Sequence, residues 1–341
     1  MSDRPADATS GVTVVIPNWN RRDLLIALLN RLRAQTYPII EVLVVDNGSE
    51  DGSPEAARCA GARVIELGRN MGFSGAVNRG IEETQTDLVA IVNNDVEPEP
   101  DWLEQLATAI EQPRVAFAAG KLRSTASPDS LDGTYDAICR GACAWRAGHG
   151  SKDGPLWDRQ RTIRFVPFTA TLFRTDLFRK IGGLDERFRS YLEDVDFCLR
   201  SARQGYRGLY VPRAVARHQG SATLGRWNRE VVRLIARNQV LLLAKHYPLR
   251  YLFRYGWPIF VAQALWGTLA VAHGQPWAFV RGKFEGLALI PGVRREIRRS
   301  GGWPKGLSRI LEESETEIYR IQRRTGFDLY WRLYFALTCL S

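Results

Sequence analysis

Residues 182–218 read GGLDERFRSYLEDVDFCLRSARQGYRGLYVPRAVARH. After the two glycines, the stretch contains five carboxylates: Asp185, Glu186, Glu193, Asp194 and Asp196. The pattern predicts a helix over 195–204, which Gly205 ends, and then a strand over 206–215, with His218 just after it. A single Asp where a loop enters a helix usually caps that helix. Two adjacent acids, followed by a strand and a histidine, also suit a general base and a metal ligand that converge on one site.

The residues before this stretch alternate between apolar runs and amphipathic segments. The runs predict strands over 12–17, 40–45, 63–66 and 88–92, and the segments predict helices over 23–36, 54–60, 75–84 and 100–110. This alternation implies right-handed βαβ units and a mostly parallel, Rossmann-like sheet flanked by helices, so we predict an α/β fold. Another strand is predicted over 164–173, whereas we interpret 121–165 as loops with room for a hairpin.

Polar residues follow three of the predicted strands. Asn18 and Asn20 end the first, Asp46 ends the second, and Asp95 follows the fourth. Ordinary turn chemistry explains any one of them. Because ligands of parallel sheets bind at the carboxyl ends of the strands, their convergence predicts a binding site there.

Composition and charge exclude several classes of protein. The 341 residues carry a net charge of +10 and include five cysteines without a CxxC pair, so neither a zinc site nor a disulfide framework is indicated. No nucleic-acid-binding motif occurs. The N-terminus lacks the apolar segment of a signal peptide, and no run of about twenty apolar residues is present, so we expect a cytoplasmic protein. Late arginines interleaved with Trp and Tyr suit an anionic membrane surface, which predicts peripheral association with the inner face of the cell membrane. The alternative is a second helical layer that only packs on the core.

Six motifs in order resemble those of family 2 glycosyltransferases, the inverting enzymes with the GT-A fold. They are VTVVIPNWN (12–20), VVDNGS (44–49), GFSGAVNRG (72–80), NNDVEPEPDWL (93–103), GGLDERFRSYLEDVDFCLR (182–200) and the late His218. The resemblance spans 11–246. Within the family, the pattern is most similar to that of bacterial rhamnosyltransferase-like enzymes. It implies a flexible N-terminus over 1–10, a GT-A catalytic domain over 11–246, and a C-terminal helical region over 247–341 that can associate with membranes.

The resemblance also assigns roles to residues. It implies that a nucleotide-sugar donor is bound by Pro17, Asn18, Trp19, Asn20, Asp46, Gly75, Asn78, Asn93, Asn94 and Arg237. Trp19 would stack on the base or pack in the core, and Arg237 would contact phosphate or serve the structure. Asp95 matches the last acid of the family's Asp-x-Asp motif. Because Asn93 and Asn94 depart from the acidic form, His218 would supply the other ligand to Mn²⁺ or Mg²⁺.

The catalytic base implied by the resemblance is Asp194, with Glu193 as the fallback, while Asp196 is expected to cap the helix. The implied reaction moves a sugar from its nucleotide to a hydroxyl of a lipid-linked or polymeric cell-surface glycan, as in cell wall and polysaccharide biosynthesis. The donor that the resemblance implies is dTDP-rhamnose. Another UDP- or dTDP-sugar is the alternative, because 169–171 has Thr where related enzymes often have Gly near the sugar. A nucleotidyltransferase is disfavoured by the loop at 17–20, which is neither glycine-rich nor basic. A non-catalytic binder is disfavoured because binding alone needs no base.

Overall fold

The computed structural model describes residues 11–220, 227–303 and 305–338, and the predicted flexible segment 1–10 lies outside them. Contacts divide the chain into two compact units. Unit 1 comprises Met1–Tyr135, Gly148–Arg189 and Tyr206–Gly220, and unit 2 comprises Asp136–Ala147, Ser190–Gly205 and Ser221–Ser341. This division does not test the domain boundaries predicted from the sequence, which remain predictions.

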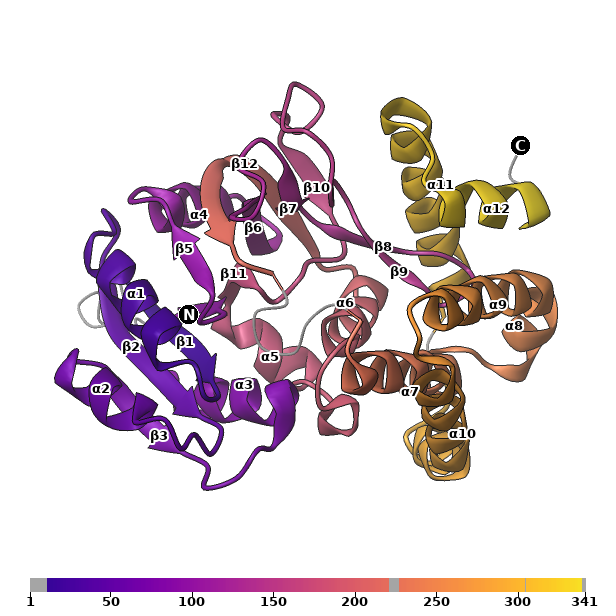
Figure 1. The fold of residues 1–341 in the computed structure, drawn as a ribbon, viewed down its shortest axis with the longest axis horizontal. Helices are drawn as coiled ribbons and strands as arrows, with labels where there is room; N and C mark the ends of the chain where they lie inside the picture. The colour runs from indigo at the N-terminus through magenta and orange to yellow at the C-terminus, as the bar shows by residue number, and fades with distance from the viewer. Residues whose placement is uncertain (1–10, 221–226, 304, 339–341) are drawn as a thin grey trace, which may run out of the picture. The chain divides into compact units, whose positions relative to one another are not determined.

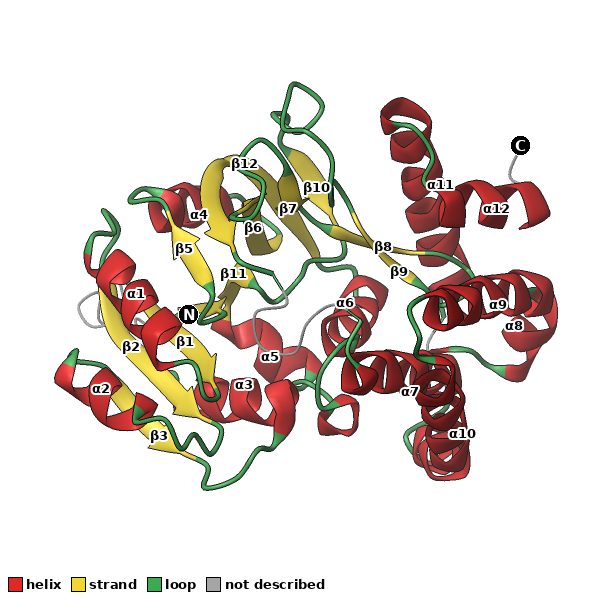
Figure 2. Ribbon diagram, viewed as in Figure 1, coloured by secondary structure: helices red, strands yellow, loops and turns green. Residues whose placement is uncertain are grey.

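Unit 1 is built on one large sheet, coloured yellow in Figure 2. Its strands are β1 (Val12–Asn18), β2 (Ile39–Asp46), β3 (Arg63–Glu66), β4 (Leu88–Val92), β5 (Val96–Pro98), β6 (Val115–Ser124), β7 (Leu131–Gly133), β10 (Arg161–Ile163), β11 (Ala170–Arg174) and β12 (Arg207–His218). The order is β10-β12-β6-β11-β4-β1-β2-β3, with β5 on β12 and β7 on β6. β4, β1, β2 and β3 are parallel, and so are β6 and β12, while β11 is antiparallel to β4 and β6. This mostly parallel mixed sheet confirms the predicted α/β class.

Helices cover both faces of the sheet, which explains the continuous apolar runs. They are α1 (Arg22–Arg33), α2 (Ser53–Cys59), α3 (Gly72–Glu83), α4 (Trp102–Ile110) and α5 (Thr175–Ile181). Val14 and Ile16 share a core with residues of α1, α2 and α4. On the opposite face, a Cβ added at Gly80 of α3 would lie 2.3 Å from Val15, so the glycine permits close packing. The side chains on both faces of β1 are therefore buried, apart from the partly exposed Pro17.

The interpretation of 121–165 as loops with a hairpin was wrong at its start, where β6 ends, and also where β7 and β10 join the large sheet. Strand β6 runs over Val115–Ser124 near the centre of the sheet. Its small residues, including Gly120, have weak strand propensity, which hides it in the sequence. A Cβ at Gly120 would lie only 1.9 Å from the Ala214 carbonyl oxygen, where the register of β12 shifts. The close approach of two backbones therefore requires the residue that weakens the pattern.

Unit 2 is mainly helical and confirms the predicted helical region near the C-terminus. Its elements are β8 (Asp136–Ile138), β9 (Ala144–Arg146), α6 (Glu193–Arg203), α7 (Arg229–His246), α8 (Leu249–Arg254), α9 (Gly256–Ala272), α10 (Pro276–Arg299), α11 (Leu307–Thr325) and α12 (Leu329–Thr338). The hairpin allowed for in 121–165 is formed by β8 and β9. No helix within the described residues is both long and apolar enough to cross a membrane.

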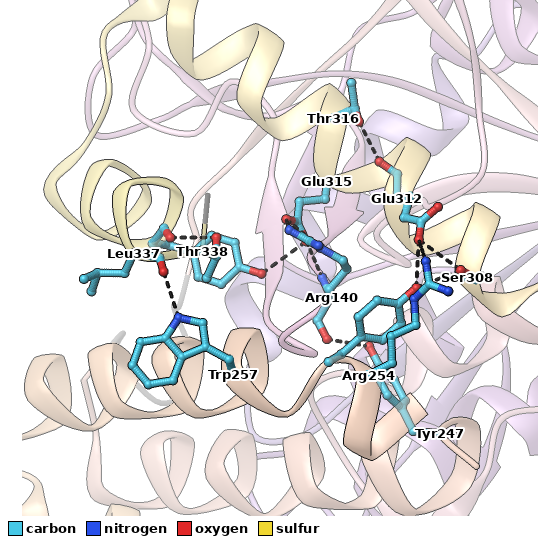
Figure 3. A network of polar contacts seen from close by, with 12 residues as sticks. Arg140, Tyr247, Arg254, Trp257, Ser308, Glu312, Glu315, Thr316, Leu337 and Thr338 are labelled. Carbon is cyan, nitrogen blue, oxygen red and sulfur yellow. Dashed lines mark hydrogen bonds and ion pairs between the residues drawn. The ribbon is translucent and has the colours of Figure 1, made fainter. Parts of the chain in front are cut away.

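A buried ion pair holds the β8–β9 hairpin against the helices of unit 2. Arg140, in the turn of the hairpin, donates from Nε and from a terminal nitrogen to Glu315 of α11, at 3.0 and 2.7 Å (Figure 3). The backbone N–H of Arg140 also donates to this carboxylate at 2.6 Å, and the Tyr334 hydroxyl donates to it at 3.1 Å. Glu315 is fully buried. Its charge is therefore compensated by several donors, as a buried carboxylate requires.

Candidate active site

The polar ends of three adjacent strands lie together in unit 1. The Asn94 side chain, just beyond β4, donates to Asn18 Oδ1 of β1 at 2.7 Å. Asn18 in turn donates through Nδ2 to Asp46 Oδ1 of β2 at 3.3 Å. All three side chains are buried. The structure thus brings together the three predicted donor-binding residues Asn18, Asp46 and Asn94 at the carboxyl edge of the sheet.

The loop after β2 is shaped by Asp46 and Asn20. Asp46 Oδ2 accepts from the N–H groups of Gly48 and Ser49, at 3.1 and 2.8 Å, so one carboxylate oxygen is committed to the turn. Asn20, with a φ of 49°, accepts from the N–H of Glu50 at 2.8 Å. Pro17 and Trp19 are partly exposed beside them. These contacts fix two loops at the sheet edge while Trp19 keeps an accessible surface.

His218 and two carboxylates form the most strongly charged cluster of this edge. His218 ends β12, with Nε2 3.2 Å from Asp95 Oδ1 and Nδ1 2.8 Å from Asp132 Oδ2. Burial alone would lower the pKa of His218, but its hydrogen bonds to Asp132 and Asp95 raise that pKa to about 9. The sequence predicted Asp95 and His218 here. It gave no signal for Asp132, which comes from the segment interpreted as loops.

The residues of this cluster fit a divalent cation. His218 Nε2 and Asp95 Oδ1 lie 3.2 Å apart, joined by the proton that His218 donates, and a cation that displaced this proton would find both atoms within reach. Asp132 would then hold the other ring nitrogen, as a carboxylate behind a metal-ligating histidine commonly does. Asn93 Oδ1 is buried, with no hydrogen-bond partner among the described residues. Within the described part of the chain, no group of three or more His, Cys, Asp or Glu side chains is arranged to hold a metal ion by itself.

Asn78 and Gly75 lie on α3, whose first four residues are the GFSG motif. Asn78 donates to the Leu184 carbonyl at 2.9 Å and accepts from the Leu184 N–H at 2.7 Å, so its amide holds the loop after the Gly182–Gly183 pair. Gly75 is buried in α3. Asn47, which the sequence analysis did not single out, donates to the Gly72 carbonyl at 3.1 Å and accepts from Met71 at 2.7 Å. Asn47 thus holds the loop at the start of α3, and Asn78 holds the loop after Gly183.

The predicted base belongs to unit 2, at the start of α6. Asp194 is the second residue of this helix, and its Oδ1 accepts from the N–H of Val195 at 2.7 Å. Loss of hydration and the negative charge of Asp136 raise the pKa of Asp194 to about 7, while Arg146 opposes the change. Glu193 is buried, and its Oε2 has no hydrogen-bond partner among the described residues. Burial, followed by the charge of Asp194, raises the pKa of Glu193 well above its usual range.

The backbone before α6 is held in an unusual conformation. Tyr191 and Leu192 have φ values of 71° and 67°, in the left-handed region that L residues rarely adopt. Asn238 of α7 is fully buried and donates to the carbonyls of Ser190 and Tyr191, at 2.9 and 2.7 Å. Arg237, a predicted donor-binding residue, donates to Asn238 Oδ1 at 2.7 Å. Strain of this kind is characteristic of functional loops, and here it lies directly before the two acids.

The expectation that Asp196 caps α6 was wrong. Its side chain is fully buried and accepts from His246 at 2.8 Å, Lys245 at 2.9 Å and Arg200 at 3.0 Å. Burial by itself would raise the pKa of Asp196, but Lys245 and Arg200 hold that pKa well below its usual range. Asp196 therefore joins α6 to the end of α7 through its three cationic or polar partners.

Comparison with known proteins shows the family of the chain. Residues 13–182 match the model of the family described as glycosyl transferase family 2. A relative from Mycobacterium tuberculosis, named N-acetylglucosaminyl-diphospho-decaprenol L-rhamnosyltransferase, is 30% identical over 246 residues, covering 64% of this chain and 79% of the relative.

Solved structures with the same fold are glycosyltransferases. The mannosyltransferase of Pyrobaculum calidifontis, in complex with GDP-mannose and Mn²⁺, has a TM-score of 0.51 and 19% identity, covering 97% of this chain and 87% of its own. GalNAc-T7 with UDP, GalNAc and Mn²⁺ has a TM-score of 0.62 and 13% identity, covering 94% of this chain and 59% of its own. From its sequence and its GT-A fold, the chain belongs to glycosyl transferase family 2.

Proposed function

We propose that the protein is an inverting, metal-dependent glycosyltransferase that transfers rhamnose from dTDP-rhamnose to a hydroxyl of a lipid-linked glycan. The observation that carries the mechanism is Asp194, whose carboxyl at the start of α6 has its pKa raised to about 7. The donor and the acceptor are suggested by the Mycobacterium tuberculosis relative, whose name specifies rhamnosyl transfer to a diphospho-decaprenol-linked sugar. Another UDP- or dTDP-sugar, or a polymeric acceptor, is the alternative.

Asp194 acts as the general base in this proposal. It takes the proton from the acceptor hydroxyl while that oxygen forms a bond to the anomeric carbon of the donor. The bond from this carbon to the diphosphate breaks in the same step, so the configuration inverts and no covalent enzyme intermediate forms. A general base contributes about 10²–10⁴-fold to such a step, most effectively when its pKa lies near the working pH.

The strand ends of unit 1 bind the donor in this proposal. Asn18, Asp46 and Asn94 form one hydrogen-bonded edge, and Trp19 offers a partly exposed ring beside it for the base. Asp95 and His218 would hold Mn²⁺ or Mg²⁺, which neutralises charge on the leaving diphosphate when bound. Gly75, Asn78, Asn93 and Arg237 remain proposed donor contacts, although the described bonds of Asn78 and Arg237 are structural.

A lipid-linked acceptor places the protein at the inner face of the cell membrane as a peripheral protein. The net charge of +10 favours such a location, because cytoplasmic leaflets are anionic.

Incubation with a panel of nucleotide sugars, a polyprenyl-diphosphate-linked acceptor and Mn²⁺ tests the proposal. We expect release of the nucleoside diphosphate and a radiolabelled lipid product from dTDP-rhamnose, with the anomeric configuration inverted. Asp194→Asn should abolish transfer while leaving donor affinity nearly unchanged. Transfer by this variant within about tenfold of the wild-type rate would defeat the assignment of the base, and Glu193→Gln would then be the next variant. Product formation only with another sugar would replace the donor.

A further inference from the structure

Helix α9 lacks the polar face that a surface helix needs in water. None of its 17 residues is charged. Trp257, Phe260 and Val271 are nevertheless 56%, 62% and 60% exposed, and the smaller Ala264 and Thr268 are exposed between them. The spacing of these five residues is three or four positions, so they share one side of the helix. A helix that is apolar all round is normally buried or in contact with lipid.

The exposed side of α9 continues onto its neighbours in unit 2. The ring of Trp257 stacks on that of Phe260 with centroids 5.7 Å apart, and its indole nitrogen donates to the Leu337 carbonyl of α12 at 2.8 Å (Figure 3). Leu333 and Leu337 lie one turn apart on α12 and are 38% and 47% exposed. Phe253 of α8, four positions before Trp257, is 85% exposed. We use the term aromatic face for five exposed residues of α8, α9 and α12, namely Phe253, Trp257, Phe260, Leu333 and Leu337.

The charges on the same helices are all positive. Helices α8, α9 and α12 contain no acidic residue, whereas Arg250, Arg254 and Arg332 on α8 and α12 are exposed. Arg250 and Arg332 make no salt bridge within the described residues, while Arg254 pairs with Glu312 at 3.3 Å. Exposed aromatic rings with arginines beside them match the boundary between lipid headgroups and acyl chains.

Helix α10 repeats the combination along its length. Exposed apolar residues occupy its first half, with Trp277 at 80%, Phe284 at 68% and Leu287 at 50% exposure. Its last turns carry the exposed Arg295, Arg298 and Arg299, which make no salt bridge within the described part of the chain. Each arginine near an anionic membrane surface adds to the affinity and makes it sensitive to salt.

We propose that the aromatic face docks into the surface of an anionic phospholipid bilayer, with its rings among the headgroups and its arginines on lipid phosphates. A second copy of the chain is a poorer occupant, because two such faces would bring like charges together. The helices lie on the bilayer, since none within the described residues can span it. The inference rests on the proposed function for its purpose, which is access to a lipid-linked acceptor, but its test requires no substrate.

Vesicle sedimentation of the full-length protein tests the proposal. Phosphatidylcholine vesicles with and without phosphatidylglycerol are compared, at low and high salt. We expect the wild-type protein to sediment with the anionic vesicles at low salt and to be released by high salt. Phe253→Ser, Trp257→Gln and Phe260→Ser combined should reduce the partition coefficient by about tenfold or more, because three large side chains no longer leave water. The matched control is Ile40→Ser in unit 1, an exposed apolar residue (57%) whose loss should leave binding unchanged.

The outcomes separate this proposal from the proposed function. Circular dichroism checks the folding of each variant. If the triple variant unfolds because Trp257 no longer donates to Leu337, the double variant Phe253→Ser, Phe260→Ser is used in its place. Wild-type protein that stays in the supernatant, or a substituted protein that binds within about twofold of wild type, overturns the docking surface. A dimer that the substitutions dissociate, without vesicle binding, identifies a second copy as the occupant and also overturns it. Vesicle binding without release of nucleoside diphosphate would leave the docking surface intact and defeat the proposed function.

Discussion

The ionisation of Asp194 predicts the pH dependence of sugar transfer. With a pKa raised from 3.8 to about 7, the carboxylate is about one tenth ionised at pH 6 and about nine tenths ionised at pH 8. A base must be ionised to take a proton, so kcat should fall about tenfold per pH unit below about pH 6 and level off above about pH 8. A base with the ordinary pKa of 3.8 would give a constant rate over the same range.

Two substitutions on the β8–β9 hairpin should move this profile in opposite directions. Asp136 raises the pKa of Asp194 and Arg146 lowers it, and these two side chains are themselves paired at 3.1 Å. Asp136→Asn should therefore move the midpoint of the kcat profile to lower pH by about one pH unit, and Arg146→Gln should move it to higher pH.

Single-turnover transfer, measured from about pH 5.5 to 8.5 with circular dichroism at each pH, is the assay for this prediction. A flat wild-type profile, or a displacement of both variants in the same direction, would refute the assignment of the base.

Three further predictions concern the other charged and buried groups. Asp95→Ala and His218→Ala should both weaken the Mn²⁺-dependent binding of a nucleoside diphosphate, Asp95→Ala more because it removes charge, and an unchanged metal titration in either variant would exclude that residue as a ligand. Asp196→Asn should lower the free energy of unfolding by about 3–5 kcal/mol in urea, since it leaves Lys245 and Arg200 without their buried carboxylate. Asn238→Ala should lower kcat with little change in the Kd of the nucleotide sugar, because two carbonyls of the strained loop lose their hydrogen bonds to Asn238. Binding of the nucleotide sugar that weakens by the same factor as kcat would contradict a positioning role.

The sequence predicted the fold wherever burial on both faces leaves a continuous apolar run. Strands β1, β2 and β4 and the helices that follow them were predicted from such runs, because βαβ units place each strand beside its neighbour. Strand β6 escaped because Gly120 and its small neighbours serve close packing against β12, and close packing leaves no hydrophobic pattern in the local sequence. A residue selected by a distant backbone can be recognised only after that backbone is placed.

The residues of the candidate site also fall into those whose positions follow from the topology and those whose positions depend on distant contacts. Strand-end residues such as Asn18, Asp46 and Asn94 could be predicted to converge, because topology alone brings the ends of adjacent parallel strands together. The contacts of Asp132 and Asn238 could not be predicted, because each residue hydrogen-bonds to residues more than forty positions away in the sequence. The role of Asp196 was misjudged for the same reason, because its partners His246 and Lys245 lie at the far end of α7.

The three acids at the start of α6 illustrate how structure separates groups that the sequence leaves equivalent. Asp196 is surrounded by cations that keep its pKa low, so it stays ionised and its oxygens are occupied. Glu193 is buried, its Oε2 has no hydrogen-bond partner among the described residues, and burial followed by the charge of Asp194 raises its pKa well above its usual range. Only Asp194, with a pKa of about 7, can both accept and release a proton under working conditions. Because environments that push neighbouring pKa values apart mark the division of labour in a site, the base is better assigned to Asp194 than to either neighbour.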